Sequence, residues 1–264
     1  MRVPVVRHGT LRRRARRRRV WWTGGELLVT VGVVLLLLVA YQLWWTNEQA
    51  RRGAERTVEA LEREWGTDSS SGSEVAAPGG ESEAPAHGAG SGDASRPGAS
   101  RQGGSAGTRP ERPDGSQAYA ILTISRLGLR VPVAEGIGRQ GVLDKGYVGH
   151  YPVTQQPGQM GNFALAGHRN THGEPFRHLD RLAPRDTVEV ETRAAVYTYA
   201  VDTTLAQTSA RDSGVLREIP RSIVHPAHGY TRPGHYLTLT TCTPEYTSRY
   251  RLVVWGTLVS SRPR

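Results

Sequence analysis

Cysteine is almost absent from this 264-residue chain, because Cys242 is the only one. A single thiol cannot close an internal disulfide, so the chain has no disulfide framework of its own. Cys242 can therefore be a buried bystander, a partner in an intermolecular disulfide or a reactive thiol. A repeat with a period of about 20–50 residues is also absent, which excludes a solenoid or a propeller.

Outside the first twenty residues the chain carries almost no net charge. Nine of the 34 basic side chains and none of the 24 acidic ones lie in residues 1–20. The other 25 basic side chains nearly balance the acidic ones. That part of the chain carries no phosphate-binding footprint, so we expect no nucleic-acid partner.

Charge is absent altogether from residues 27–45, a run of 19 residues. As a helix this run is about 29 Å long, enough to cross the core of a bilayer. Tryptophan pairs at 21–22 and 44–45 bracket it, and the arginine run 12–19 precedes it. This pattern predicts a cytoplasmic Arg-rich tail (1–20) and a transmembrane signal anchor (21–45), with the rest of the chain outside the cell. A cleaved signal peptide fits less well, because bulky residues stand where a small-x-small cleavage site belongs.

Large apolar side chains almost vanish between residues 66 and 116, where 27 of 51 residues are Gly, Ser or Pro. Such a segment cannot bury enough surface to offset its ordering entropy, so we predict a disordered linker. Residues 46–65, before it, are typical of a charged juxtamembrane helix. Val58, Leu61 and Trp65 fall at helical spacing, although Gly53 weakens the prediction.

Residues 117–264 are enough for one domain with its own core, and their pattern is that of β-structure. Short runs rich in β-branched and aromatic residues alternate with clusters of Gly, Pro, Asn and Asp. A short helical turn is expected near 174–182. We predict an all-β fold, a barrel or a sandwich. The expected strands are 119–124, 129–133, 162–167, 187–192, 196–201, 236–241 and 251–259.

Cys242 lies in a favourable place for chemistry. Period-two alternation puts it on the face of its strand that carries Thr238 and Thr240, opposite Leu239. If this strand and the next form an antiparallel hairpin, Arg251 lies near Cys242. A guanidinium there would favour a thiolate or bind a developing oxyanion.

His168 is the candidate base, because it follows Gly167 at the end of another expected strand. A cysteine, a histidine and a cation are sufficient for acyl transfer through a thioester. Spacing does not show that His168 reaches Cys242.

We expect no metal and no other cofactor. His168 and His172 are four residues apart, but Gly167, Asn170 and Gly173 predict a loop where a helix would be needed to pair them. The glutamate of an H-E-x-x-H motif is absent, and no acidic cluster suggests a calcium site. The remaining histidines considered are expected on the surface or in turns: His150, His178, His225, His228 and His235.

Three runs, "LAGHR" (165–169), "GEPFRHLDRLAPRDTVEVET" (173–192) and "YLTLTTCTPEYTSRYRLVVWG" (236–256), resemble the sortase family. Sortases are membrane-anchored cysteine transpeptidases of Gram-positive bacteria, built on a closed eight-stranded β-barrel. The resemblance covers most of residues 117–260. It implies that Cys242 is the nucleophile, His168 the general acid and base, and Arg251 the stabiliser of the oxyanion or substrate. Arg249 competes for this last role, but Arg251 opens the apolar strand directly.

Residues 149–169, "GHYPVTQQPGQMGNFALAGHR", most resemble class E sortases of actinobacteria. The resemblance implies cleavage of an L-A-x-T-G or L-P-x-T-G sorting signal between Thr and Gly, and transfer to a cell-wall amine. The expected partners are surface proteins with a C-terminal sorting signal, a peptidoglycan precursor amine and the cytoplasmic membrane. Tyr151 is a candidate for selecting Ala over Pro, with a core or rim aromatic as the alternative. Thr241 is a further substrate-binding candidate, and a structural role is its alternative.

Two other functions stay open. One is a sortase with a specialised task in spores or pili, although residues 101–118 lack the aromatic plug that marks many pilus enzymes. The other is a non-catalytic, membrane-tethered β-barrel that binds wall or partner proteins. The joint presence of Cys242, His168 and Arg251 favours an enzyme over such a scaffold.

Overall fold

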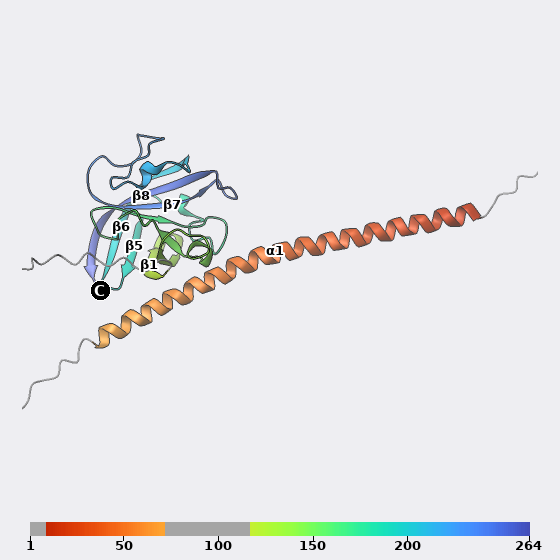
Figure 1. Ribbon diagram of the computed structural model, residues 1–264, viewed down its shortest axis with the longest axis horizontal. Coiled ribbons are helices and arrows are strands. Elements are labelled where there is room, and N and C mark those ends of the chain that lie inside the picture. The colour runs from red at the N-terminus through yellow and green to blue at the C-terminus, as the bar shows by residue number, and fades with distance from the viewer. Residues whose placement is uncertain (1–8, 72–116) are drawn as a thin grey trace, which may run out of the picture.

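The computed structural model describes residues 9–71 and 117–264, as one long helix and a β-barrel (Figure 1). Residues 66–71 of the predicted disordered linker, 66–116, belong instead to the long helix, and the rest of the linker, from residue 72 onward, lies outside the described residues. The first eight residues of the predicted tail lie outside them as well.

Eight strands close into a barrel in the order β1-β2-β3-β4-β7-β8-β6-β5. Strand pairs β2/β3 and β4/β7 are parallel, and the other six are antiparallel. The prediction of a closed, eight-stranded, all-β domain is confirmed. The strands are β1 (Ala118–Ile124), β2 (Leu129–Glu135), β3 (Val148–His150), β4 (Gly161–Ala166), β5 (Thr187–Thr192), β6 (Ala195–Ser209), β7 (His235–Thr243) and β8 (Tyr250–Pro263).

The predicted strands are all present, and alternation explains why. In β5 the side chains of Val188 and Val190 are fully buried in the core, while Glu189 between them is exposed. The expected helical turn near 174–182 is a short 3₁₀ helix, Leu179–Arg181, whose surroundings bury Phe176 in the same core. Only β3 was not predicted, since three residues are too few to show a period.

One face of β7 points into the barrel interior. The connection from β6 to β7 covers much of the other face. Leu237 and Leu239 pack in the interior core, as alternation predicts. Thr238 lies on the outer face, where its hydroxyl donates to Asn162 Oδ1 at 2.7 Å, and Val215 from the connection lies over them. Cys242, one residue before the end of β7, is half-buried, whereas Thr241 and Thr243 beside it are buried.

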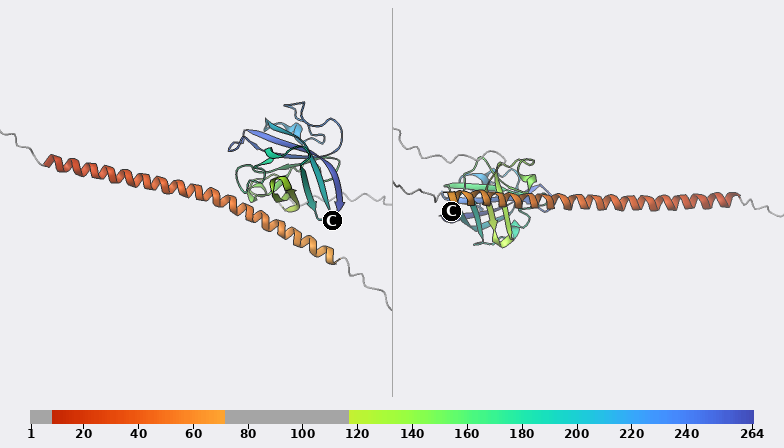
Figure 2. Two further views of the ribbon diagram at one scale, coloured as in Figure 1. Left: turned by 180° about the vertical axis from the view of Figure 1, so that it is seen from behind. Right: turned by 90° about the horizontal axis from the view of Figure 1, so that it is seen from below.

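Helix α1 runs without a break from Gly9 to Ser71 and joins the predicted tail, anchor and juxtamembrane helix. Residues Gly25–Thr67 include a window of mean hydropathy 2.4 in which no residue is buried, so the helix is long and apolar enough to cross a membrane. Both views in Figure 2 show its second half lying along the barrel and its first half projecting away. Val58, Leu61 and Trp65 pack there against Ile121 of β1.

Polar contacts fix the start of this docked segment to the loop that follows β4. The Asn47 amide donates to Glu174 Oε1 at 2.8 Å, and Arg51 Nε donates to the Gly173 carbonyl at 3.1 Å. Further along the helix, the hydroxyls of Thr57 and Tyr147 are 2.7 Å apart. The helix is therefore packed against the same loop that carries His168.

The surface or turn position expected for His150 is wrong. The residue belongs to β3 and is 0% exposed. Its Nδ1 lies 2.8 Å from Glu135 Oε2 and its Nε2 lies 3.0 Å from the Gln155 carbonyl. Burial is tolerated because both ring nitrogens have partners.

Candidate active site

Cys242 and Arg251 lie side by side on neighbouring strands. Strands β7 and β8 pair antiparallel with Cys242 directly opposite Arg251. Directly opposite residues of an antiparallel pair project from the same face of the sheet. The prediction that Cys242 and Arg251 are neighbours in an antiparallel hairpin is confirmed, and both residues are half-buried.

The opposite neighbour of β7 brings His168 toward Cys242. Strands β4 and β7 pair in parallel, and the last partners are Ala166 and Thr240. His168 and Cys242 each follow this last pair by two residues, so the pairing brings the start of the His168 loop near the end of β7, although the two residues are 74 positions apart in the sequence. Cys242 is thus flanked by Arg251 on one side and by the start of the His168 loop on the other.

Hydrogen bonds fasten the start of that loop to the end of β7. The Gly167 amide donates to the Thr240 carbonyl at 3.2 Å, and the Thr241 hydroxyl donates to the Gly167 carbonyl at 2.9 Å. Buried Arg169 donates from Nη1 to the Cys242 carbonyl at 3.3 Å and to Thr243 Oγ1 at 2.9 Å. These contacts restrict where His168 can lie relative to Cys242. Sequence reasoning missed Arg169, whose position beside His168 was its only signal.

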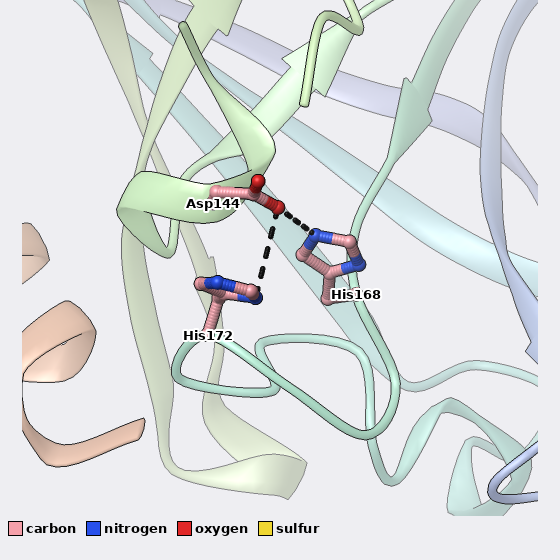
Figure 3. Close-up of side chains that lie close together, drawn as sticks. All are labelled: Asp144, His168 and His172. Carbon is pink, nitrogen blue, oxygen red and sulfur yellow. Dashed lines mark hydrogen bonds and ion pairs between the residues drawn. The ribbon is translucent and has the colours of Figure 1, made fainter. Parts of the chain in front are cut away.

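Asp144 orients His168. This carboxylate comes from the 3₁₀ turn Leu143–Lys145 between β2 and β3, and its Oδ1 lies 2.9 Å from His168 Nε2 (Figure 3). Nδ1 of His168 makes no hydrogen bond within the described part of the chain. Burial lowers the pKa of His168 below its usual value, and the hydrogen bond to Asp144 opposes that shift. A neutral imidazole with its proton on Nε2 then offers Nδ1 as a base.

Replacing Asp144 with asparagine should lower kcat for acyl transfer by about tenfold to a hundredfold and leave KM nearly unchanged. The amide no longer requires a proton on Nε2, so the ring loses its fixed tautomer. Steady-state kinetics with Asp144→Glu as the conservative variant test this. Partial recovery of kcat by Asp144→Glu supports positioning, and equal KM and kcat losses in both variants contradict it.

Arg251 is free to meet a substrate. Its Nη1 donates to the carbonyls of Ser248 and Tyr250 at 2.9 and 3.0 Å, while Nε and Nη2 have no hydrogen-bond partner among the residues described. Arg249 is exposed in the β7–β8 turn, where its guanidinium lies 5.1 Å from the centre of the Tyr250 ring. The register thus favours Arg251 over Arg249 as the partner of Cys242.

Tyr151 and Thr241 lie in different environments. The Tyr151 hydroxyl is 3.1 Å from Thr240 Oγ1, on the same face of β7 as Cys242 and two residues before it. Tyr151 is half-buried there and can line a peptide site. Thr241 is 3% exposed and bonded to Gly167, a geometry that supports its structural alternative.

Two side chains that were not predicted as catalytic or binding residues contact His168. Besides Asp144, the ring of His172 stacks on that of His168 with centroids 5.3 Å apart. The loop prediction that spoke against a metal pair is correct for this segment. That prediction took no account of Asp144, which the turn before β3 places between the two imidazoles.

Comparison with known proteins decides the family. The sortase domain model matches residues 122–259, just over half of the chain. The chain belongs to the sortase family. It is 40% identical to Sortase SrtE1 of Streptomyces coelicolor over 229 residues, covering 85% of this sortase and 53% of that protein. It thus spans about half the length of that curated relative. Sortase SrtE2 of the same organism is 35% identical, with 83% of this chain and 74% of that protein covered.

Solved sortase structures agree with the barrel described above. The crystal structure of sortase E1 from Streptomyces coelicolor, with a tripeptide in its active site, is 47% identical at a TM-score of 0.53. The match covers 56% of this sortase and 92% of that chain. Sortase E from Streptomyces avermitilis is 40% identical at a TM-score of 0.50, with the same coverage. The predicted likeness to class E sortases is therefore confirmed.

Proposed function

We propose that this sortase is a membrane-anchored cysteine transpeptidase that cleaves a C-terminal sorting signal between Thr and Gly and transfers the protein to a cell-wall amine. The observation that carries the proposal is the position of Cys242 between Arg251 and the start of the His168 loop. The sequence likeness to class E sortases supports an L-A-x-T-G signal, with L-P-x-T-G as the alternative.

The chemistry follows from the three side chains. The thiol proton of Cys242 passes to Nδ1 of His168, and Sγ bonds to the carbonyl carbon of the signal's threonine. Arg251 stabilises the negative oxygen that develops there. The imidazolium of His168 then protonates the glycine nitrogen as the C–N bond breaks, which leaves a thioester on Cys242.

The second half of the reaction reverses these roles. An incoming amine gives a proton to His168 and attacks the thioester carbon, and the thiolate of Cys242 leaves. That thiolate regains its proton from His168, so each atom and proton is returned. A lowered pKa of His168 supports a resting pair of thiol and neutral imidazole over thiolate and imidazolium.

The docked helix supports a reaction close to the membrane. Residues 47 and 51 contact the loop after His168, and they follow Trp45 by only two and six positions. At 1.5 Å per residue these contacts lie about 3–9 Å along the helix from Trp45. If residues 21–45 span the bilayer with the N-terminus inside, the site lies close to the outer surface of the membrane. Precursors that are linked to the membrane are found at the same surface.

The proposal is tested with the full chain in detergent micelles, an L-A-x-T-G peptide and a short amine acceptor. We expect a ligated product that carries the amine and lacks the C-terminal glycine, detected by mass spectrometry. An L-P-x-T-G peptide measured beside it separates the two signals. A folded chain that processes neither peptide favours the non-catalytic barrel.

Tyr151→Ala should reduce the preference for L-A-x-T-G over L-P-x-T-G by about tenfold, as the loss of one packed aromatic contact would. The ratio of kcat/KM for the two peptides measures this effect. Tyr246, 76% exposed, offers a matched control in Tyr246→Ala. An unchanged ratio in the Tyr151 variant would assign Tyr151 to the rim of the barrel alone.

A further inference from the structure

Asp144, His168 and His172 converge from two separate segments. Asp144 stands in the turn before β3, and both histidines come from the loop after β4 (Figure 3). One ligand atom from each residue can be chosen so that all three atoms lie within 4.8 Å of one another. All three side chains are half-buried, so the cluster is reachable from solvent.

His172 gives an independent indication of a ligand. Its Nδ1 is buried, has no hydrogen-bond partner, and lies 3.6 Å from Asp144 Oδ1. Buried polar atoms are almost always hydrogen-bonded, so a buried nitrogen that faces a carboxylate at 3.6 Å without a hydrogen bond calls for an explanation. The backbone of His172 also has a positive φ of 52°, an uncommon conformation outside glycine.

The loop is held in this conformation from both sides. The next residue, Gly173, donates its amide to Asn47 Oδ1 at 3.3 Å and accepts from Arg51 at its carbonyl. At the loop's far end, the Phe176 amide donates to the His168 carbonyl at 3.0 Å. Nδ1 of His172, which has no hydrogen bond, therefore belongs to a loop that other contacts fix in place.

The donor set is that of a transition-metal site. Two imidazole nitrogens and one carboxylate oxygen match zinc sites that have three protein ligands and one open position. Calcium and magnesium instead prefer oxygen ligands alone. Asp144 Oδ1 is 2.9 Å from His168 Nε2 and 3.6 Å from His172 Nδ1. Ligands at about 2.0–2.2 Å from a tetrahedral zinc lie roughly 3.3–3.5 Å apart, a separation close to both of these distances.

We propose that Asp144, His168 and His172 bind Zn²⁺ and that Cys242 is not one of its ligands. Zinc takes the lone pair of His168 Nε2, and the remaining imidazole proton then resides on Nδ1. An Nδ1 that carries a proton cannot accept the proton of Cys242. Bound zinc therefore inhibits acyl transfer reversibly, a consequence that rests on the function proposed above.

Equilibrium dialysis against buffered Zn²⁺ tests the site without any assay of activity. The full chain is kept in detergent micelles with a phosphine reductant that does not compete for zinc, and bound metal is counted by mass spectrometry. We expect the native chain and Cys242→Ala to bind zinc with the same affinity. His172→Asn should bind it at least about tenfold more weakly, because a ligand is lost. Asparagine accepts a positive φ, so the loop keeps its shape.

His225→Asn is the matched control, since it removes an exposed imidazole elsewhere. Thermal unfolding of each variant checks its fold, and His172→Gln replaces His172→Asn if the latter unfolds early. Zinc binding that survives in His172→Asn but is lost in Cys242→Ala would assign the metal to the thiol and overturn the proposal. So would the absence of binding at micromolar zinc.

Activity provides a second, separate readout. Zinc should inhibit the native chain, and the zinc concentration for half inhibition should rise at least about tenfold in His172→Asn. Each rate is divided by the metal-free rate of the same variant, because the His172 ring stacks on His168 and its loss can lower the basal rate by itself. Equal zinc sensitivity of both chains contradicts the proposal. If the native chain lacks transpeptidase activity, the proposed function fails while dialysis still decides on the metal site.

Discussion

Cys242→Ala is expected to lower transpeptidation by about 10⁴-fold or more, to the level of the reaction without enzyme. The substitution removes the only thiol of the chain, and with it the thioester that divides one difficult step into two easier ones. His168→Ala should lose a similar factor, because it removes the proposed general base and acid from the loop beside the end of β7. Initial rates of product formation measure both losses.

The double variant sharpens this prediction. Residues that act as one unit are not additive, so Cys242→Ala combined with His168→Ala should be no slower than either single variant. His225→Ala removes an exposed imidazole whose ring contact is with His228, and it controls for the loss of an imidazole. Turnover that persists in Cys242→Ala, or losses that multiply in the double variant, would contradict a Cys–His unit.

Arg251→Ala is expected to lower kcat by about 10²–10³-fold, the usual loss when one donor to an oxyanion is removed. The reason is the register, which sets Arg251 opposite Cys242 with Nε and Nη2 free of partners within the described residues. Arg251→Lys should recover only part of this loss, because an ammonium lacks the planar fork of the guanidinium. Kinetics with the L-A-x-T-G peptide give these values.

Arg249 provides the matched control, since it is an arginine two residues away in the same hairpin. Arg249→Ala removes an exposed charge that stacks on Tyr250, so its kcat should stay within about threefold of native. The opposite ranking of the two variants would transfer the oxyanion role to Arg249.

Alternation predicted the β-strands well but left a barrel and a sandwich open, and the resemblance to sortases supplied the closed barrel. Val188 and Val190 face the core while Glu189 does not, and this period is visible without a structure. The pairing of Cys242 with Arg251 was also predictable, since a hairpin needs only two adjacent strands and a short turn. Strand β3 has three residues and no readable period.

The rest of the site depends on contacts between distant segments. The parallel pairing of β4 with β7 brings the start of the His168 loop beside the end of β7, and no local pattern specifies which strands are neighbours. Asp144 stands in a turn without a motif, so its position between two histidines could not be predicted. Helix α1 shows the same limit: the spacing of Leu61 and Trp65 indicates an apolar face, but not that Ile121 of β1 covers it.

The covalent intermediate tests the central claim most directly. The full chain in detergent micelles is mixed with an L-A-x-T-G peptide without an amine acceptor, quenched in acid and digested for peptide mass mapping. We predict that the peptide's acyl part, ending in threonine, is attached to Cys242 and is released by an added amine. A processed peptide with no adduct on Cys242, or an adduct on another residue of the native chain, would contradict the account.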